Sequence, residues 1–323
     1  MGASVRRLYE QGKEINGAGI NCSFAIHQDI NGKATDIALG WAVALGAPFS
    51  FETTLRDEYN SDIFGERGIL LGGVHGLCEA AYKWFIAQGE SKEAAFLKTA
   101  EVVTGPITEI MSKKGLKAVY ESFEGEDRET FEKAYSFAYE PCFDVLLEIY
   151  EDVASGNEIR GVVFADDRYK RFSISKIENM PMWQVGARIE NKPESVALNP
   201  VVAGIHMACM IAQIDLLIEK GHCYSEIANE SVIEAVDYLY PYMAFRGAAY
   251  MIDNCSMTAK LGARKWAPRF DYALCQEAFP KLDAGFEADA DKIEAFKGHV
   301  IHKIMETCLS LSPSVDIFVK EIA

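Results

Sequence analysis

Three acidic side chains stand four residues apart in the segment EYNSDIFGERG. Glu58, Asp62 and Glu66 occupy positions i, i+4 and i+8, which lie along one face of a helix. Carboxylates at this spacing repel one another, weakly on an exposed helix and strongly once they are buried. A bound divalent cation would relieve the repulsion, whereas a solvated acidic face would need none.

A second acidic pair follows far along the chain. Glu230 and Glu234, in NESVIEAVD, again stand at i and i+4, with apolar residues around them. The first acidic segment also runs into an apolar stretch, 69–71, so neither segment is polar on all sides. Oxygen ligands suit Mg²⁺ or Mn²⁺ rather than zinc. The two acidic groups together predict a site for two metal ions.

Other kinds of active site have weaker support in the sequence. The six histidines form no HExxH motif, and no acidic or cysteine residue is placed to complete a metal site with His299 and His302. Gly17 and Gly19 begin a GxG run, but Cys22 occupies the third glycine position of the dinucleotide fingerprint. We therefore expect packing roles for the histidines and assign no cofactor-binding residue.

A hydroxyl group and three cations occur shortly after the second acidic pair. Ser256 is followed by Lys260, Arg264 and Lys265 in SMTAKLGARKW. Such a group would suit an anionic substrate. A basic helix end would explain the same cations equally well.

The composition excludes several classes of protein. The chain has 323 residues, with 32 basic and 48 acidic side chains and a formal net charge of −16. This excess of acid opposes binding to a phosphate backbone, so no nucleic-acid partner is expected. The longest apolar stretch, 201–218, is interrupted by polar residues and is interpreted as too short to span a membrane. Eight cysteines without a CxxC pair indicate reduced thiols in a soluble protein.

The apolar pattern predicts a mainly α-helical chain that starts with one βα unit. Residues 17–29 are expected to form a strand and 33–45 a helix, with no further parallel strand. Residues 1–48 would be one unit and 49–323 a helical one, with halves 49–180 and 181–323 joined through a connector at 156–200. Helices are expected over 53–64, 69–88, 92–103, 128–137, 143–153, 201–220, 225–239 and 292–309.

The helical region contains a candidate internal repeat. An offset of 132 residues aligns 68–104 with 200–236 and pairs Gly72 with Gly204. Lys98 and Val102 of the first copy then stand where the second copy has its acidic pair. Chance similarity between two long apolar helices is the alternative explanation.

Four long segments form a specific combination. They are the run from Gly19 to Gly76, then YEDVASGNEIRGVV, HCYSEIANESVIEAVDYL and MIDNCSMTAKLGARKWAPRFDY. Together they resemble ketol-acid reductoisomerase (acetohydroxy acid isomeroreductase) in its long, plant-type form, and the resemblance covers nearly the whole chain. It implies a knotted all-α domain, arising from a duplication, preceded by a Rossmann-type NADPH-binding domain.

The resemblance also implies roles for the acidic residues. Asp62 would bridge two Mg²⁺ ions, Glu66 would bind one of them, and Glu230 and Glu234 would bind the other. Asp62 and Glu234 are the catalytic candidates, and Glu234 would also relay a proton. Glu58 would orient the residues that bind metal.

The implied substrate is a small anionic acetohydroxy acid. Ser256 would hydrogen-bond it, and Leu70 and Leu239 would form the walls around the migrating alkyl group. In this family two Mg²⁺ ions assist the shift of a methyl or ethyl group, and NADPH then reduces the product, in valine and isoleucine synthesis. A homo-oligomer is expected, with no nucleic-acid or membrane partner, in the plastid of a plant-like eukaryote or in a bacterial cytoplasm.

This sequence departs from the family in its first part. The glycine-rich turn, catalytic histidine and lysine of the family's NADPH-binding domain are not recognisable, so 1–48 is interpreted as the C-terminal remnant of that domain. Without the rest, hydride transfer by this chain alone is expected to fail. One hypothesis is a truncated form of the enzyme. The other is a stand-alone helical metal-binding or assembly protein without reductase activity.

A βα unit without its sheet neighbours is expected to expose apolar side chains. The strand and helix would present Ile20, Phe24, Ile26, Ile37 and Trp41 as an adhesive patch.

Overall fold

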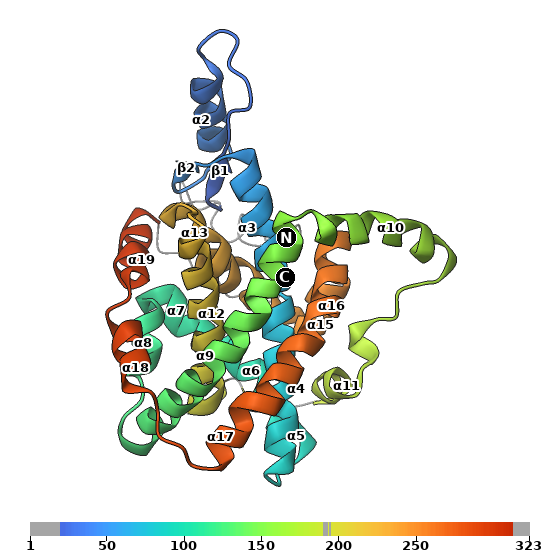
Figure 1. Ribbon diagram of the computed structural model, residues 1–323, viewed down its shortest axis with the longest axis vertical. Helices are drawn as coiled ribbons and strands as arrows, with labels where there is room; N and C mark the ends of the chain where they lie inside the picture. Colours follow the sequence, from blue (N-terminus) through green and yellow to red (C-terminus); the bar gives the residue numbers. More distant parts are fainter. Residues whose placement is uncertain (1–19, 190–192, 194, 313–323) are drawn as a thin grey trace.

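The computed structural model describes residues 20–189, 193 and 195–312 (Figure 1). The start of the predicted strand, with Gly17 and Gly19, lies outside these residues. The described residues form a helical body from which a small unit of two strands and a helix projects at one end (Figure 1). The mainly α-helical fold preceded by a βα unit is therefore confirmed.

The projecting unit consists of β1 (Cys22–Phe24), α2 (Ala34–Ala44) and β2 (Ser50–Glu52). Its strands pair in parallel, with Cys22 opposite Ser50. The helix begins and ends within one residue of the predicted bounds. The prediction of no further parallel strand is wrong, because β2 pairs in parallel with β1. β2 was missed because it has only three residues and shows no alternating apolar pattern.

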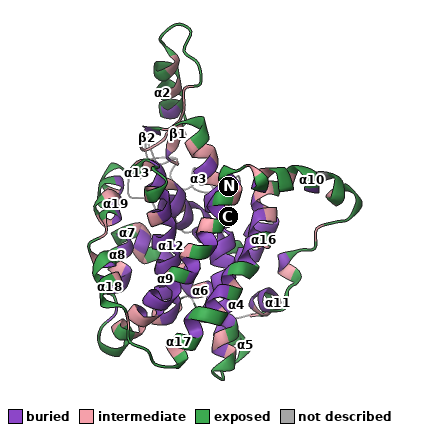
Figure 2. Ribbon diagram, viewed as in Figure 1, coloured by how far each residue is buried: buried purple, intermediate pink, exposed green. Residues whose placement is uncertain are grey.

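The apolar patch predicted for this unit is present on its helix. Ile37 and Trp41 are 56% and 67% exposed on α2, much of which is exposed in Figure 2. Ile20, Phe24 and Ile26 are instead half-buried, so the prediction is wrong for the strand. The two residues before β1 join the unit to the helical body: Asn21 donates to Tyr238 and Asn229, and Ile20 packs against the core.

The helical body begins with α3 (Leu55–Arg67), which enters directly from β2. It contains three π-helical segments and one short 3₁₀-helix among the described residues. In chain order the remaining elements are α4 (Gly72–Ala87), α5 (Lys92–Leu97), α6 (Ala100–Val102), η1 (Val103–Ile107), α7 (Thr108–Lys114), α8 (Leu116–Glu121), α9 (Gly125–Ala154), α10 (Asn157–Arg171), η2 (Ile177–Asn179), α11 (Pro181–Arg188), α12 (Pro200–Glu219), α13 (Tyr224–Ala228), η3 (Asn229–Leu239), α14 (Tyr240–Arg246), α15 (Ala248–Asp253), α16 (Met257–Ala273), η4 (Leu274–Ala278), α17 (Phe279–Asp283), α18 (Ala290–Lys297) and α19 (Val300–Leu311).

Several predicted helices differ from the structure. The helix predicted over 92–103 is α5, α6 and the start of η1, and the helix predicted over 292–309 is α18 and α19, which are separated at residues 298 and 299. The helices predicted over 128–137 and 143–153 are one helix, α9, which continues through Pro141. The helix predicted over 225–239 is α13 followed by the π-helix η3.

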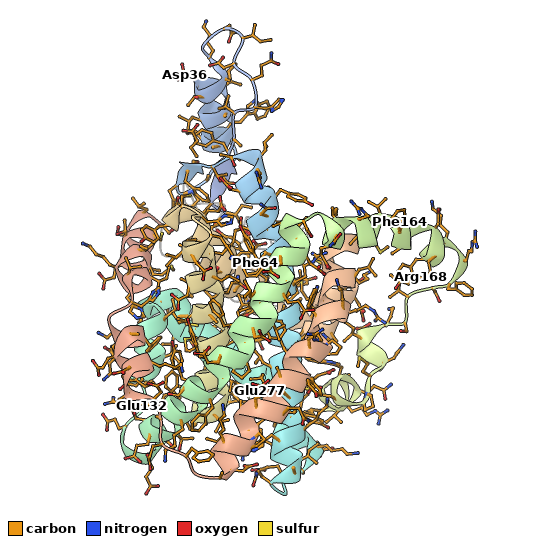
Figure 3. The ribbon with its side chains drawn as sticks, viewed as in Figure 1. Asp36, Phe64, Glu132, Phe164, Arg168 and Glu277 are labelled. Carbon is orange, nitrogen blue, oxygen red and sulfur yellow. The ribbon has the colours of Figure 1, made fainter. Side chains whose placement is uncertain are left out.

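The predicted connector holds α10 and α11. α10 was missed because seven of its fifteen residues are charged. It projects from the body, with Phe164 and Arg168 near its outer end (Figures 1 and 3).

The helical elements repeat along the chain at the predicted offset of 132 residues. α7 and α14, Gly115 and Gly247, and α8 and α15 correspond residue for residue. Both of these glycines have positive φ, as do Gly89 and Gly221, which follow α4 and α12. The candidate repeat is therefore present as a repeat of structure, and each predicted half contains one copy.

The two copies interlock by exchanging helix partners. α12 of the second copy packs along α9 of the first, and α4 of the first packs along α16 of the second. Glycines allow both approaches: a Cβ at Gly204 would lie 2.7 Å from the Phe131 oxygen, and one at Gly76 would lie 2.3 Å from the Ala267 oxygen. The knot implied by the family resemblance is a separate property and stays a prediction.

Helix α12 lies in the centre of the core. By length and composition it could cross a membrane, so the prediction that the stretch is too short is wrong. Every residue from 201 to 214 is buried, and 89% of its most apolar window lies inside the protein. Its apolar surface is thus covered by its own neighbours, as expected for a core helix.

Arg67 is a fully buried cation at the end of α3. Its guanidinium donates to Glu66 at 3.0 Å, to Glu158 at 3.1 Å, and to the hydroxyl of Thr258 at 2.9 Å. A Cβ at Gly262 would lie 2.6 Å from the guanidinium carbon, so that position has to be small. Arg67 therefore joins α3 to α10 and α16.

Replacing Arg67 should destabilise the fold. The Arg67→Met variant is expected to lose about 3 kcal/mol of unfolding free energy, because it leaves the buried carboxylate of Glu158 with one cation fewer. Lys265 still pairs with Glu158 at 2.6 Å, which keeps the loss near the lower end of the range for broken buried pairs. Denaturant titration followed by circular dichroism measures it. Arg67→Met combined with Glu158→Met should recover part of the loss, and a loss below about 1 kcal/mol in the single variant would contradict this account.

Candidate metal centre

The first acidic helix, α3, begins at a capping residue. Thr54 accepts a hydrogen bond from the Asp57 amide at 3.0 Å, which satisfies a donor that the helix leaves free. Asp57 and Glu58 add negative charge to the first turn, where the helix dipole favours it. Further along, Asn60, Ser61, Phe64 and Gly65 are buried. The helix is thus held with its second half inside the body.

The second acidic segment is the π-helix η3, which approaches α3 closely. A Cβ at Gly65 would lie 3.1 Å from the backbone oxygen of Glu230 and 3.0 Å from Leu70. The buried amide of Gln213 accepts from the Ile69 amide at 2.8 Å and donates to the Glu230 oxygen at 3.4 Å. α12 therefore fixes the end of α3 and the start of η3 to each other.

This approach brings together three of the predicted metal-binding residues. One carboxylate oxygen each of Asp62, Glu230 and Glu234 lies within 4.8 Å of the others. Glu230 and Glu234 are each 5% exposed, and Oε2 of Glu230 is buried without a hydrogen-bond partner. Buried polar atoms are normally satisfied. The donor set and the unsatisfied oxygen fit a hard divalent cation such as Mg²⁺.

Burial makes the charged forms of these carboxyl groups costly. Burial, followed by the charge of Asp62, raises the pKa of Glu234 to about 8. Burial raises the pKa of Glu230 well above its ordinary value, with further contributions from Glu234 and Asp62. Burial also raises the pKa of Asp62, against the opposing effect of Arg67. The cluster therefore holds protons near neutral pH unless a cation replaces them.

Glu66 and Glu58 lie beside this group of three. Glu66 pairs with Arg67 at 3.0 Å, and burial, followed by the charge of Asp62, raises the Glu66 pKa to about 7. Glu58 is half-buried, and its pKa is raised by burial and then by the charges of Asp62 and Glu226. Both neighbours thus interact electrostatically with Asp62, and their predicted roles stay predictions.

The candidate substrate residues occupy different environments. Ser256 is exposed and caps α16, accepting from the Ala259 amide at 3.1 Å. Leu70 is fully buried and Leu239 is 2% exposed. The roles predicted for these three residues stay predictions.

Two of the cations after Ser256 have structural partners. Arg264 donates to the backbone oxygen of Ser175 at 2.5 Å, and Lys265 pairs with Asp152 and Glu158. Both cations lie in the middle of α16 and have protein partners, so the alternative explanation of a basic helix end is wrong for them.

The sequence interpretation missed several residues that shape this centre. Gln213 and Arg67 gave no signal beyond being polar in apolar surroundings. Glu226 stands one turn before Glu230, so the acidic spacing could have been extended to it. Its carboxylate is buried and bonded to His222.

The projecting unit does not fit NADPH in its described part. Within residues 20–52 the glycines are Gly32, Gly40 and Gly46, which stand singly and form no glycine-rich phosphate-binding turn. These residues therefore offer no phosphate-binding turn for the cofactor.

Comparison with known proteins identifies related sequences. The profile of ketol-acid reductoisomerase, C-terminal domain, matches residues 55–194, and that of acetohydroxy acid isomeroreductase, NADPH-binding domain, matches residues 1–49. The chain is 52% identical to the chloroplastic ketol-acid reductoisomerase of Spinacia oleracea, over 99% of this chain and 55% of that protein. The chloroplastic enzyme of Pisum sativum is 51% identical, over 100% and 57%. A mitochondrial ketol-acid reductoisomerase of Saccharomyces cerevisiae is 32% identical, over 60% and 49%.

The matches extend along the whole chain. This chain spans just over half the length of the two plant relatives. Two profiles of one enzyme family match consecutive parts of it, in the order of the βα unit and the helical body. The chain belongs to the ketol-acid reductoisomerase family.

Proposed function

We propose that this chain forms the metal- and substrate-binding part of a ketol-acid reductoisomerase of valine and isoleucine biosynthesis. The proposed reaction shifts a methyl or ethyl group in 2-acetolactate or 2-aceto-2-hydroxybutyrate and reduces the product with NADPH to the 2,3-dihydroxy acid. The observation that carries this proposal is the convergence of three carboxylate oxygens from α3 and η3 within 4.8 Å.

Four carboxylates would hold two Mg²⁺ ions in this proposal. Asp62 would lie between the ions, with Glu66 on one and with Glu230 and Glu234 on the other. The unsatisfied Oε2 of Glu230 supports a ligand role. Bound magnesium would polarise the carbonyl that receives the alkyl group and stabilise negative charge on the neighbouring oxygen.

The other residues would bind the substrate and move protons. Glu234 would hold and relay a proton at its carboxylate, because its pKa of about 8 lies near neutral pH. Ser256 would donate a hydrogen bond to the substrate from the start of α16. Leu70 and Leu239 would form apolar walls for the migrating group, and Glu58 would orient Asp62.

The proposal extends to the setting of the chain. We expect a small anionic substrate, no nucleic-acid or membrane partner, and assembly with further copies. The chloroplastic names of the two plant relatives support a plastid location. The chain alone is proposed not to consume NADPH, because the described residues of its βα unit form no phosphate-binding turn.

Mg²⁺ binding tests the metal site directly. Calorimetric titration of the chain should show binding, and Asp62→Asn and Glu230→Gln should each weaken it by about tenfold or more. Asp237→Asn is the matched control: Asp237 is the third carboxylate of η3, it accepts a hydrogen bond from Ser112 at 2.5 Å, and it is not in the group of three. That variant should bind like the parent.

An NADPH assay with 2-acetolactate after the same titration tests whether this chain alone carries out the reduction. Metal binding without NADPH consumption is the expected result for the proposed part of the enzyme. Consumption of NADPH would contradict the proposed inactivity of the chain alone. A folded parent that binds no Mg²⁺ would refute the metal site.

The raised pKa values predict an unusual dependence of stability on pH. Folded Glu234 and Glu66 have pKa values of about 8 and about 7, above the roughly 4.3 of an unfolded glutamate. The folded chain therefore binds these protons more tightly. Without metal, their contribution to stability is complete below about pH 4 and declines as the pH rises to about 8.

Mg²⁺ competes with the same protons, so its affinity should rise over this range and saturating Mg²⁺ should reduce the loss of stability. Thermal unfolding from about pH 5 to about pH 9, with and without Mg²⁺, measures both effects. Glu234→Gln should show a shallower decline in stability without metal. Mg²⁺ affinity that does not change with pH would count against this account.

A further inference from the structure

We propose that Glu226 is a positioning residue that sets the separation between α3 and the α13–η3 segment, and thereby the separation of the metal-binding carboxylates. The inference rests on the proposed metal site. It concerns a residue outside the group of carboxylates assigned to bind the ions. A hydrogen-bonded network around Glu226 carries the argument.

The network connects four parts of the fold through one imidazole and one carboxylate. Tyr150, on α9, lies 2.8 Å from Nε2 of His222, and Nδ1 of His222 lies 2.5 Å from Oε1 of Glu226. The other carboxylate oxygen of Glu226 accepts a hydrogen bond from Thr53, just after β2. His222 and Glu226 are 8% and 1% exposed. Both ring nitrogens and both carboxylate oxygens are thus committed to partners in the interior.

Thr53 makes the connection to α3, because it stands two residues before that helix begins. Burial acts to raise the pKa of Glu226, and hydrogen bonds from His222 and Thr53 outweigh it, so the pKa lies below its ordinary value. Glu226 is therefore an ionised acceptor for donors from both sides of the joint.

The position of Glu226 makes it a spacer for the metal centre. It lies on α13, one helical turn before Glu230, and its partner Thr53 stands just before the start of α3, the helix that carries Asp62. The Gln213 contacts fix the other end of the same joint, at Ile69 and the Glu230 backbone. One polar contact on each side of the carboxylates, made by Glu226 and by Gln213, therefore sets the distance between α3 and η3.

Stability alone is a weak explanation for this network. Buried polar groups seldom stabilise a fold more than apolar residues of similar volume, because the polar groups lose their hydration. The hydrogen bonds of His222 and Glu226 instead fix the distances and angles between the segments that they join. Mg²⁺ needs such precision: it requires oxygen distances of about 2.0–2.1 Å, whereas Ca²⁺ accepts about 2.3–2.6 Å in flexible sites.

The experiment compares Mg²⁺ and Ca²⁺ affinities of the full chain by calorimetry. Glu226→Leu should weaken Mg²⁺ binding by about tenfold to a hundredfold and should weaken Ca²⁺ binding much less, because Ca²⁺ tolerates a wider site. Glu226→Gln keeps an acceptor for Thr53 and a group that can bond His222, so it should restore most of the Mg²⁺ affinity. Asp237→Asn is the control and should leave both affinities unchanged.

A milder variant keeps the test decisive if Glu226→Leu does not fold. Thr53→Val removes one donor to Glu226 and should lower the ratio of Mg²⁺ to Ca²⁺ affinity by a few fold. Equal losses for both ions, or an unchanged ratio in folded variants, would overturn the positioning role. A parent chain that binds no Mg²⁺ would overturn the proposed metal site, and this inference with it.

Discussion

The close approach of α3 to η3 is the constraint on which the candidate centre depends. Gly65 permits it, because a side chain there would meet the backbone oxygen of Glu230. Gln213 maintains it by bonding the Ile69 amide on one side and the Glu230 oxygen on the other. Asp62 comes from the first helix and Glu234 from the second, so the centre exists only when both are held together.

That approach also creates an electrostatic problem that the surrounding structure reduces. Carboxyl groups gathered away from water have raised pKa values, because burial and mutual repulsion oppose ionisation. Arg67 compensates part of the charge from the side of Glu66. The remaining deficit of positive charge favours protons on these carboxyl groups, and under the proposed function divalent cations would replace those protons.

The repeated architecture explains why the acidic residues come from distant parts of the sequence. α4 and α12 each pack against the long helix of the other copy, so neither copy completes its core alone. The offset of 132 residues was visible in the sequence, because helix-ending glycines and long apolar runs recur at fixed spacing. The exchange of partners was not visible, since apolar helices carry no information about which neighbour covers them. The second copy has Glu230 and Glu234 where the first has Lys98 and Val102, which makes the two copies chemically unequal.

The sequence by itself determined the helical class, the βα unit, the acidic spacing and the family, because these follow from local periodicity and from long matching segments. Only the tertiary structure decided the short strand β2, the helices α10 and α11, and the π-helical form of η3, whose backbone oxygen at Glu230 is bound by Gln213 on another helix. It also decided which carboxylates converge. Residues spaced four apart share a face wherever a helix forms, but the distance from Asp62 to a helix some 170 residues later is set by packing that no local pattern encodes.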